Sequence, residues 1–272
     1  MLALEGVGEV IVVDDGSTDE TAQVCDSFGD SRLKLIRHPH NMGVAKARNT
    51  GVEAATATWV LFGEDDCRFP ADYALVLRDE GKRAGADIIG APLLHVAAES
   101  ESEITRLAAE LPRSSEPPTM DDSDVFPVQA TQTPFLPARV LVRSAVFERV
   151  RFFEGFPSNG YREETDFFVQ AARAGFRCLL TPATFCYQIE TWTGGQHHSS
   201  TLRYEFWTLR NNWLFLKRHG AWMAEQGYIR GVISSQLSFT LRRLRIVAKG
   251  AASARVARIS AALRAKTNSP AP

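Results

Sequence analysis

The sequence lacks any apolar run near the roughly 20 residues that a membrane-spanning helix needs. It also lacks a positively charged start followed by an apolar core, the pattern of a secretory signal peptide. The four cysteines are Cys25, Cys67, Cys178 and Cys186. They form no close pair and no Cys/His cluster, which argues against a structural zinc site or a redox pair. These absences predict a cytoplasmic protein with reduced thiols that does not span the membrane.

Acidic residues are absent after Glu225, although nine of the 31 basic residues follow it. The part before that point therefore holds 22 basic and 32 acidic groups, a net charge of -10 against -1 for the whole chain. A basic tail on an acidic body favours peripheral contact with an anionic membrane or a lipid-linked phosphate, ahead of nucleic acid. A solvated helix face accounts for the same charges, and the sequence leaves both interpretations open.

Apolar patterning predicts an α/β fold with a mainly parallel, mixed sheet flanked by helices. The expected strands cover residues 9–13, 33–36, 58–62, 87–90, 125–142, 177–180 and 184–188. The expected helices cover residues 44–55, 71–84, 163–174, 202–219 and a basic amphipathic stretch from 228 onward. A further helix is expected to begin at Ser17, with Glu20 completing a capping box. Two of the strands run into acidic clusters, which would lie at the carboxyl ends where such sheets bind ligands.

Four polar motifs follow one another along the chain. They are Val12-Val13-Asp14-Asp15-Gly16-Ser17-Thr18-Asp19, Asn41-Met42-Gly43 with Ala47-Arg48-Asn49, Glu64-Asp65-Asp66, and Glu163-Glu164-Thr165-Asp166. Their order and spacing resemble the family 2 inverting glycosyltransferases of the GT-A (Rossmann-like) fold, over about residues 9 to 220. The resemblance implies transfer of a sugar from a nucleotide-diphosphate-sugar donor to a hydroxyl of a glycan or lipid-linked acceptor. It does not identify the sugar, the base or the acceptor.

The resemblance implies that Asp15 hydrogen-bonds the nucleotide base, with Asp14 and Asn41 in the same nucleotide-binding region. Arg48 would lie beside the nucleotide, where its guanidinium suits a base edge or phosphate oxygens. An ordinary arginine on a helix face is the alternative.

The acidic cluster after the third expected strand corresponds to the family's metal motif, which implies Mg²⁺ or Mn²⁺ on the diphosphate. Asp65 is the first expected ligand and Asp66 the second, while Glu64 binds either the ribose or the metal through water. Family members often have a metal-binding histidine where Gln188 stands here. That role is either lost or taken by His197 or its neighbour in the 192–200 loop.

At the last motif Glu164 occupies the place of the family's catalytic base, which removes the proton of the acceptor hydroxyl. Asp166 would orient the loop or the acceptor, and Glu163 completes the expected catalytic group. A helix N-terminus enriched in acids for dipole reasons is the competing interpretation. The glutamate, longer than the family's usual aspartate, also favours a rival in which the chain binds nucleotide sugars without catalysis.

The resemblance also implies that the family's first strand-helix unit is missing, because only eight residues precede the first expected strand. Its absence would leave an open strand edge inside the sheet and remove half of the base pocket. The expected organisation has four parts. They are a nucleotide-sugar-binding half at 1–97, an exposed connection at 98–124, an acceptor and catalytic half at 125–220, and a basic helical tail at 221–272.

Overall fold

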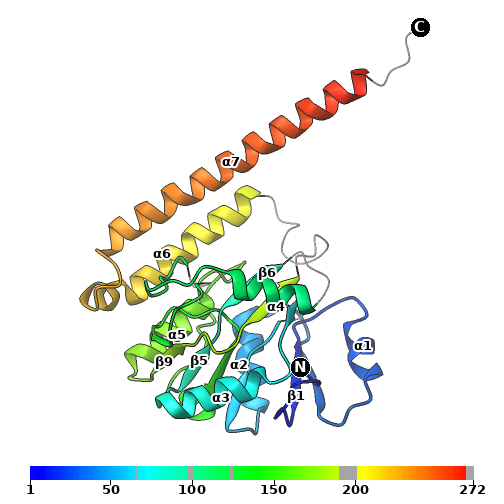
Figure 1. Ribbon diagram of the computed structural model, residues 1–272, viewed down its shortest axis with the longest axis vertical. Coiled ribbons are helices and arrows are strands. Elements are labelled where there is room, and N and C mark those ends of the chain that lie inside the picture. The colour runs from blue at the N-terminus through cyan, green and yellow to red at the C-terminus, as the bar shows by residue number, and fades with distance from the viewer. Residues whose placement is uncertain (65, 97–100, 123–124, 190–200, 268–272) are drawn as a thin grey trace. The chain divides into compact units, whose positions relative to one another are not determined.

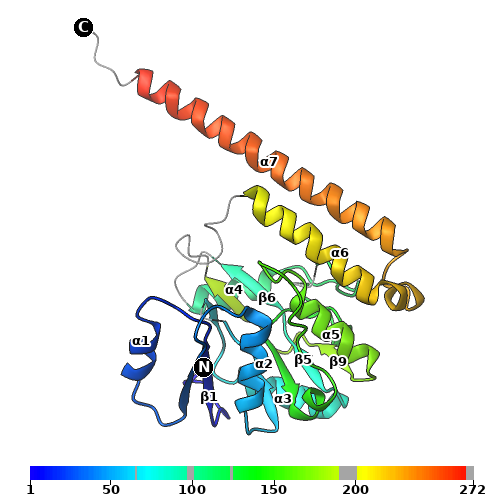
Figure 2. The same cartoon turned by 180° about the vertical axis from the view of Figure 1, so that it is seen from behind.

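The computed structural model describes residues 1–64, 66–96, 101–122, 125–189 and 201–267. The chain divides into two compact units, Met1–Ser199 and Ser200–Pro272. The first is an α/β unit and the second is helical (Figures 1 and 2). Among the described residues, no helix combines the length and the apolar character needed to cross a membrane.

The described strands of the first unit form three sheets. A two-stranded sheet contains β1 (Val10–Asp14) and β2 (Leu33–Arg37). A five-stranded sheet has the order β3 (Trp59–Leu61), β8 (Val140–Arg143), β5 (Ile88–Gly90), β9 (Cys178–Leu180) and β7 (Thr131–Gln132). A three-stranded sheet has the order β4 (Cys67–Arg68), β10 (Cys186–Ile189) and β6 (Leu93–Val96).

The α/β class and the mixed sheet are confirmed, but the antiparallel share is larger than the sequence predicts. Only β1 with β2, β5 with β9 and β6 with β10 pair in parallel among the described strands. β8 lies antiparallel between β3 and β5, with Val142 opposite both Val60 and Ile88. The expected strand at 125–142 is therefore wrong in extent, because within it only residues 131–132, as β7, and 140–142, in β8, join the five-stranded sheet.

Of the described helices of this unit, the second, third and last match the expected ones closely, the first begins later than expected, and the two between the third and the last were not expected. They are α1 (Thr21–Ser27), α2 (Val44–Ala54), α3 (Tyr73–Ala84), α4 (Glu101–Glu110), the 3₁₀ helix η1 (Ser144–Glu148) and α5 (Glu163–Arg173). The capping box is wrong, because the Ser17 N–H donates to Asp14 Oδ1 at 2.7 Å and so belongs to the turn after β1. The Thr21 N–H donates to Asp19 Oδ1 at 3.1 Å, where α1 begins.

The core of the unit lies on both faces of the five-stranded sheet. Ile88 and Ile89 of β5 are both fully buried and belong to different apolar clusters. Successive side chains on a strand point to opposite faces, so each residue joins the cluster on its own side. Phe167 of α5 belongs to one cluster and Leu77 of α3 to the other. These helices thus anchor the segments that carry the site.

The segment expected as an exposed connection contains α4, whose inner face is buried. Ile104 and Ala108 lie four residues apart, on one face of the helix, and form an apolar cluster with Leu94 and Phe126. This face attaches α4 to the first unit, so only part of the segment is an exposed linker.

The second unit is an antiparallel pair of helices, α6 (Thr201–Glu225) and α7 (Val232–Thr267), which confirms the helical C-terminal extension. Asn212 Nδ2 donates to Gln236 Oε1 at 2.7 Å, and Arg243 Nε donates to Glu205 Oε2 at 2.8 Å. The contact made from residue 212 of α6 reaches residue 236 of α7, whereas the contact made from residue 205 reaches residue 243. The two helices therefore run in opposite directions. Asn212 therefore helps to hold the two helices together.

Candidate functional site

Asp15, directly after β1, holds the loop that leads into α2. Its Oδ1 accepts the Met42 N–H and its Oδ2 the Gly43 N–H, each at 2.8 Å, while His38 Nδ1 lies 2.7 Å from Oδ1. Burial acts to raise the pKa of Asp15, but these hydrogen bonds outweigh it and hold the pKa below its usual range. Three of the roughly four acceptor sites of the carboxylate are thus occupied.

The turn after Asp15 requires a glycine. Gly16 has φ +79°, and a Cβ at this position would lie 2.6 Å from the backbone carbon of His40. Asp14 Oδ1 accepts the Ser17 N–H across the same turn, and hydrogen bonding from the Ser17 side chain and backbone lowers the pKa of Asp14. The expected Asn41 is exposed beside the turn. The first and second motifs therefore meet through backbone packing at the carboxyl end of β1.

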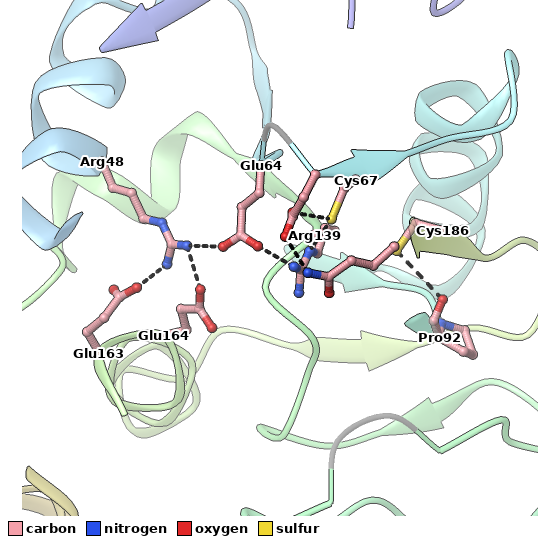
Figure 3. A network of polar contacts seen from close by, with 10 residues as sticks. Arg48, Glu64, Cys67, Pro92, Arg139, Glu163, Glu164 and Cys186 are labelled. Atoms are coloured by element: carbon pink, nitrogen blue, oxygen red, sulfur yellow. Dashed lines mark hydrogen bonds and ion pairs between the residues drawn. The ribbon is translucent and has the colours of Figure 1, made fainter. Parts of the chain in front are cut away.

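Arg48 of α2 lies at the centre of a second cluster, where it meets three other expected site residues. Its guanidinium donates through Nη1 to Glu163, and through Nη2 to Glu164 at 2.5 Å and to Glu64 at 3.2 Å (Figure 3). Segments separated by more than a hundred residues thus converge on one cation. We call Arg48, Glu64, Arg139, Glu163 and Glu164 the arginine-carboxylate cluster.

Arg139, just before β8, is a member of this cluster that the sequence analysis missed. Its Nη2 donates to the second oxygen of Glu64, and its Nε lies 2.9 Å from Cys67 Sγ. The signal for it was a lone arginine within an otherwise apolar stretch. Burial in a polar cluster requires partners on several sides, and a guanidinium with five N–H donors meets that need.

The cluster holds three carboxylates against two guanidinium groups, so its charges do not balance. Glu163 is the most enclosed, with 6% of its side chain exposed against 32% for Glu164. Burial raises the pKa of Glu163 to about 8, although the Arg48 charge offsets part of this effect. Burial and the Glu164 charge likewise raise the pKa of Glu64, against the pull of Arg139 and Arg48. We infer that Glu163 carries the surplus proton at neutral pH.

Oxygen ligands suitable for a divalent ion lie at the edge of the cluster. Ligand atoms of Glu64, Asp66 and Cys67 lie within 4.8 Å of one another. Burial raises the pKa of the Cys67 thiol to about 12, so it stays protonated, and Mg²⁺ or Mn²⁺ prefers the carboxylates. Asp66 also accepts a hydrogen bond from Gln188, whose β10 pairs with β4 at this point. These residues fit a site in which one or two carboxylates hold the ion.

The remaining expected residues lie apart from the cluster or outside the described chain. Asp166 is fully buried on α5, and its Oδ2 accepts a hydrogen bond of 2.5 Å from Gln170 one turn later. Asp65 and His197 lie outside the described residues. The sequence analysis also missed Arg162, which precedes α5 with φ +78°. This left-handed backbone is uncommon for a non-glycine residue, and the guanidinium secures it by contacts to the Met120 carbonyl and Asp121.

Residues 6–126 match the family model described as Glycosyl transferase family 2. The chain is 31% identical over 203 residues to the succinoglycan biosynthesis protein ExoO of Rhizobium meliloti, which covers 69% of this chain and 54% of that protein. It is 40% identical over 86 residues to a PGL/p-HBAD biosynthesis glycosyltransferase of Mycobacterium tuberculosis, covering 30% of this chain and 33% of that protein. The chain thus spans about half the length, or less, of these curated relatives.

Two solved structures share the arrangement of the elements. S. aureus TarS 1-349 in complex with UDP-GlcNAc has a TM-score of 0.54 and 19% identity, covering 76% of this chain and 56% of that one. GalNAc-T7 with UDP, GalNAc and Mn²⁺ has a TM-score of 0.55 and 14% identity, covering 78% and 42%. At these identities the likeness concerns the fold alone.

Proposed function

Because residues 6–126 belong to glycosyl transferase family 2 and the chain has the GT-A fold, we propose that it transfers a sugar from a nucleotide-diphosphate-sugar donor to a hydroxyl acceptor, with inversion. The observation that carries the proposal is the arginine-carboxylate cluster, which combines residues of the second, third and fourth motifs at one place. Inversion requires a carboxylate on the acceptor side of the sugar and a neutralised diphosphate on the other.

Glu164 is the proposed catalytic base. It lies in the first turn of α5, and its side chain is about a third exposed, which an acceptor hydroxyl needs for access. The carboxylate takes the hydroxyl proton while the acceptor oxygen attacks the anomeric carbon, and the diphosphate leaves from the opposite side. Arg48, which is itself held by the buried Glu163, is proposed to orient Glu164. Asp166 supports the same helix turn through Gln170.

Asp15 is proposed to receive the nucleotide base, with Asp14 and Asn41 nearby. The Asp15 carboxylate retains about one acceptor site beyond its three protein contacts, which suffices for one base N–H. The same three contacts hold the carboxylate in a single orientation, so little conformational entropy is lost on binding. The UDP-GlcNAc named in the TarS complex supports a nucleotide-sugar donor.

Asp65 and Asp66 are the proposed ligands of Mg²⁺ or Mn²⁺, which would neutralise the leaving diphosphate when bound. Both oxygens of Glu64 already accept hydrogen bonds, from Arg48 and Arg139. We therefore place Glu64 beside the ion as a residue that positions the two arginines, rather than as a direct ligand. His197 remains a candidate for a further position. The Mn²⁺ in the GalNAc-T7 complex supports a divalent ion.

We expect UDP to bind at least tenfold more weakly without Mn²⁺ than with it. Without the ion, the diphosphate charge would face the acidic cluster unscreened. Isothermal titration calorimetry with UDP, with and without Mn²⁺, measures the difference. Asp66→Asn should remove most of the metal effect. Asp72→Asn should keep it, because Asp72 is exposed and its side chain makes no capping hydrogen bond to α3. Equal affinity in the two titrations would refute the metal assignment.

A nucleotide-sugar-binding protein without catalysis is the second candidate. The pairing of Glu164 with Arg48 favours it, because a base held by a cation is less available to a hydroxyl proton. Release of UDP from a panel of UDP-sugars, with and without acceptor, separates the two functions.

The acceptor is proposed to be a glycan or lipid-linked hydroxyl, reached from a membrane surface through α7. ExoO, a relative named for succinoglycan biosynthesis, supports a glycan acceptor. Four apolar side chains of α7 are exposed at helical spacing, and basic residues accompany them. The apolar ones are Ile233, Leu237, Leu241 and Leu244, and the exposed basic ones are Arg245 and Lys249.

We expect the intact protein to sediment with liposomes only when they contain anionic lipid, and less so as salt rises. Each engaged basic group contributes about 1 kcal/mol, and the apolar stripe adds burial in the interface. Replacement of Leu237, Leu241 and Leu244 by serine should abolish binding, whereas Phe28→Ser, at the exposed apolar residue that follows α1, should not. If the triple variant still binds, or the intact protein ignores anionic liposomes at low salt, the membrane proposal fails.

A further inference from the structure

His38 lies directly after β2, beside the point where β1 ends. Its backbone N–H donates to the Asp14 carbonyl at 2.9 Å, so the parallel pairing of β1 with β2 continues past Arg37. Asp15 and His38 are therefore neighbours across the ends of the two strands. Only 8% of the His38 side chain is exposed, so both of its ring nitrogens require partners within the protein.

Both ring nitrogens of His38 have such partners. Nδ1 lies 2.7 Å from Asp15 Oδ1, and Nε2 lies 3.0 Å from the hydroxyl oxygen of Thr50 in α2. Burial acts to raise the pKa of Asp15, but hydrogen bonds, with that from His38 first among them, hold it below its usual value. The ionised carboxylate can only accept, so Nδ1 carries the proton. When the ring is neutral, Nε2 accepts from the Thr50 hydroxyl, and the three residues form one hydrogen-bonded chain.

The two oxygens of Asp15 are not equally occupied. Oδ1 accepts from His38 and from the Met42 N–H, which uses both of its lone pairs. Among the described residues, Oδ2 accepts only the Gly43 N–H, at 2.8 Å, which leaves one of its lone pairs open. His38 therefore decides which oxygen faces a ligand, because without it Oδ1 would have an open lone pair as well.

The hydrogen-bonded chain ties Asp15 to α2 at two levels. Oδ2 holds the Gly43 N–H at the N-cap of the helix, and His38 reaches Thr50 seven residues further along. Seven residues make about two turns, so both contacts come from the same face of α2. Asp15 cannot turn about its side-chain bonds without breaking contacts to this helix. Its orientation thus depends on α2 as well as on the turn after β1.

We propose that His38 is a positioning residue for the nucleotide base, which presents the open lone pair of Asp15 Oδ2 to a ring N–H of the base. The inference rests on the proposed nucleotide-sugar donor and adds the kind of base that Asp15 accepts. Uracil has a ring N–H between two carbonyl groups, and this N–H donates to the open lone pair. Cytosine has an unprotonated ring nitrogen at the same place, so two acceptors would face each other. His38 thus gives the site a preference for UDP over CDP.

Calorimetry with UDP and with CDP, each in the presence of Mn²⁺, tests this role. We expect the wild-type protein to bind UDP at least tenfold more tightly than CDP, since an unpaired acceptor is costly where the site is built for a donor. His38→Leu keeps a side chain of similar size but removes both hydrogen bonds. It should lower UDP affinity at least tenfold and CDP affinity much less, so the preference should fall to about threefold or less. A general loss of structure would weaken both nucleotides alike.

Three further variants separate the hydrogen bond from packing. His38→Asn places an amide N–H where Nδ1 donates, and it should restore UDP affinity to within about threefold of the wild-type value. Thr50→Val keeps the shape of the side chain and removes only the hydroxyl, so it should have a smaller effect than His38→Leu. Thr56→Val is the matched control, because its hydroxyl donates to Glu9 Oε1 at 2.9 Å, at the other end of β1. This control should bind UDP as the wild-type protein does.

Nitrogen NMR of the His38 imidazole provides a test that needs no substitution. We expect the proton on Nδ1, and its resonance should move when UDP binds, because Asp15 then accepts a further N–H. A proton on Nε2 alone, or a resonance that bound UDP leaves unchanged, would overturn the proposal. An unchanged ratio of UDP to CDP affinity in His38→Leu would do the same. Absence of UDP binding by the wild-type protein would instead contradict the proposed donor, and this inference with it.

Discussion

Glu164→Gln is expected to lower the rate of sugar transfer by about 10²- to 10⁴-fold, the usual contribution of a general base. The amide keeps the shape of the side chain but cannot take the acceptor proton. Donor affinity should stay within a few fold, because the base acts on the acceptor and contributes little to ground-state binding of the nucleotide. UDP release from UDP-sugars measures the rate, and UDP calorimetry measures the affinity.

Controls for this variant come from the same unit. Glu148→Gln changes an exposed glutamate of η1 and should leave the rate unchanged. Glu164→Asp keeps a carboxylate but shortens the side chain by one C–C bond, about 1.5 Å. We therefore expect this variant to have part of the activity that Glu164→Gln loses. Transfer by Glu164→Gln near the wild-type rate would move the base to Asp166 or Glu163.

Arg48→Met should lower the free energy of unfolding by about 3 to 5 kcal/mol, the usual cost of removing one partner from a buried ion pair. Methionine retains much of the apolar stem but leaves Glu163 and Glu164 without their shared cation. Arg139 still pairs with Glu64, so that end of the cluster should persist. Urea unfolding monitored by circular dichroism measures the change. Arg83→Met, at an exposed ion pair with Glu80, should have little effect.

The destabilisation by Arg48→Met should grow with pH. The pKa of Glu163 already lies above its unfolded value, at about 8, and Arg48 acts to lower it. Removing Arg48 raises this pKa further, so the folded variant holds more protons than the unfolded chain over a wider range, and its stability falls as pH rises. The loss should therefore be larger at pH 9 than at pH 6. Arg48→Lys should recover part of it. A loss independent of pH would mean that packing, and not charge, dominates at this position.

The sequence alone determined the elements and the places where polar groups leave them. Strand and helix patterns depend on residues close together in the chain, so β1, α2, α3 and α5 lie within a few residues of their predicted positions. The same local pattern predicted the acidic groups that follow β1 and β3. It misplaced the start of α1. From the local sequence, Ser17 could either cap a helix with Glu20 or hydrogen-bond the Asp14 carboxylate, and in the structure its N–H donates to Asp14.

The tertiary structure alone decided which of these groups meet. Arg48 and Glu163 are 115 residues apart, and nothing local distinguishes such an arginine from one on an exposed helix face. The buried position of Arg139 and the shifted pKa of Glu163 likewise follow from the packing of distant segments. A sequence pattern reflects interactions between residues that are close together in the chain. Charge pairing, burial and strand edges depend on neighbours in space, which only the folded chain supplies.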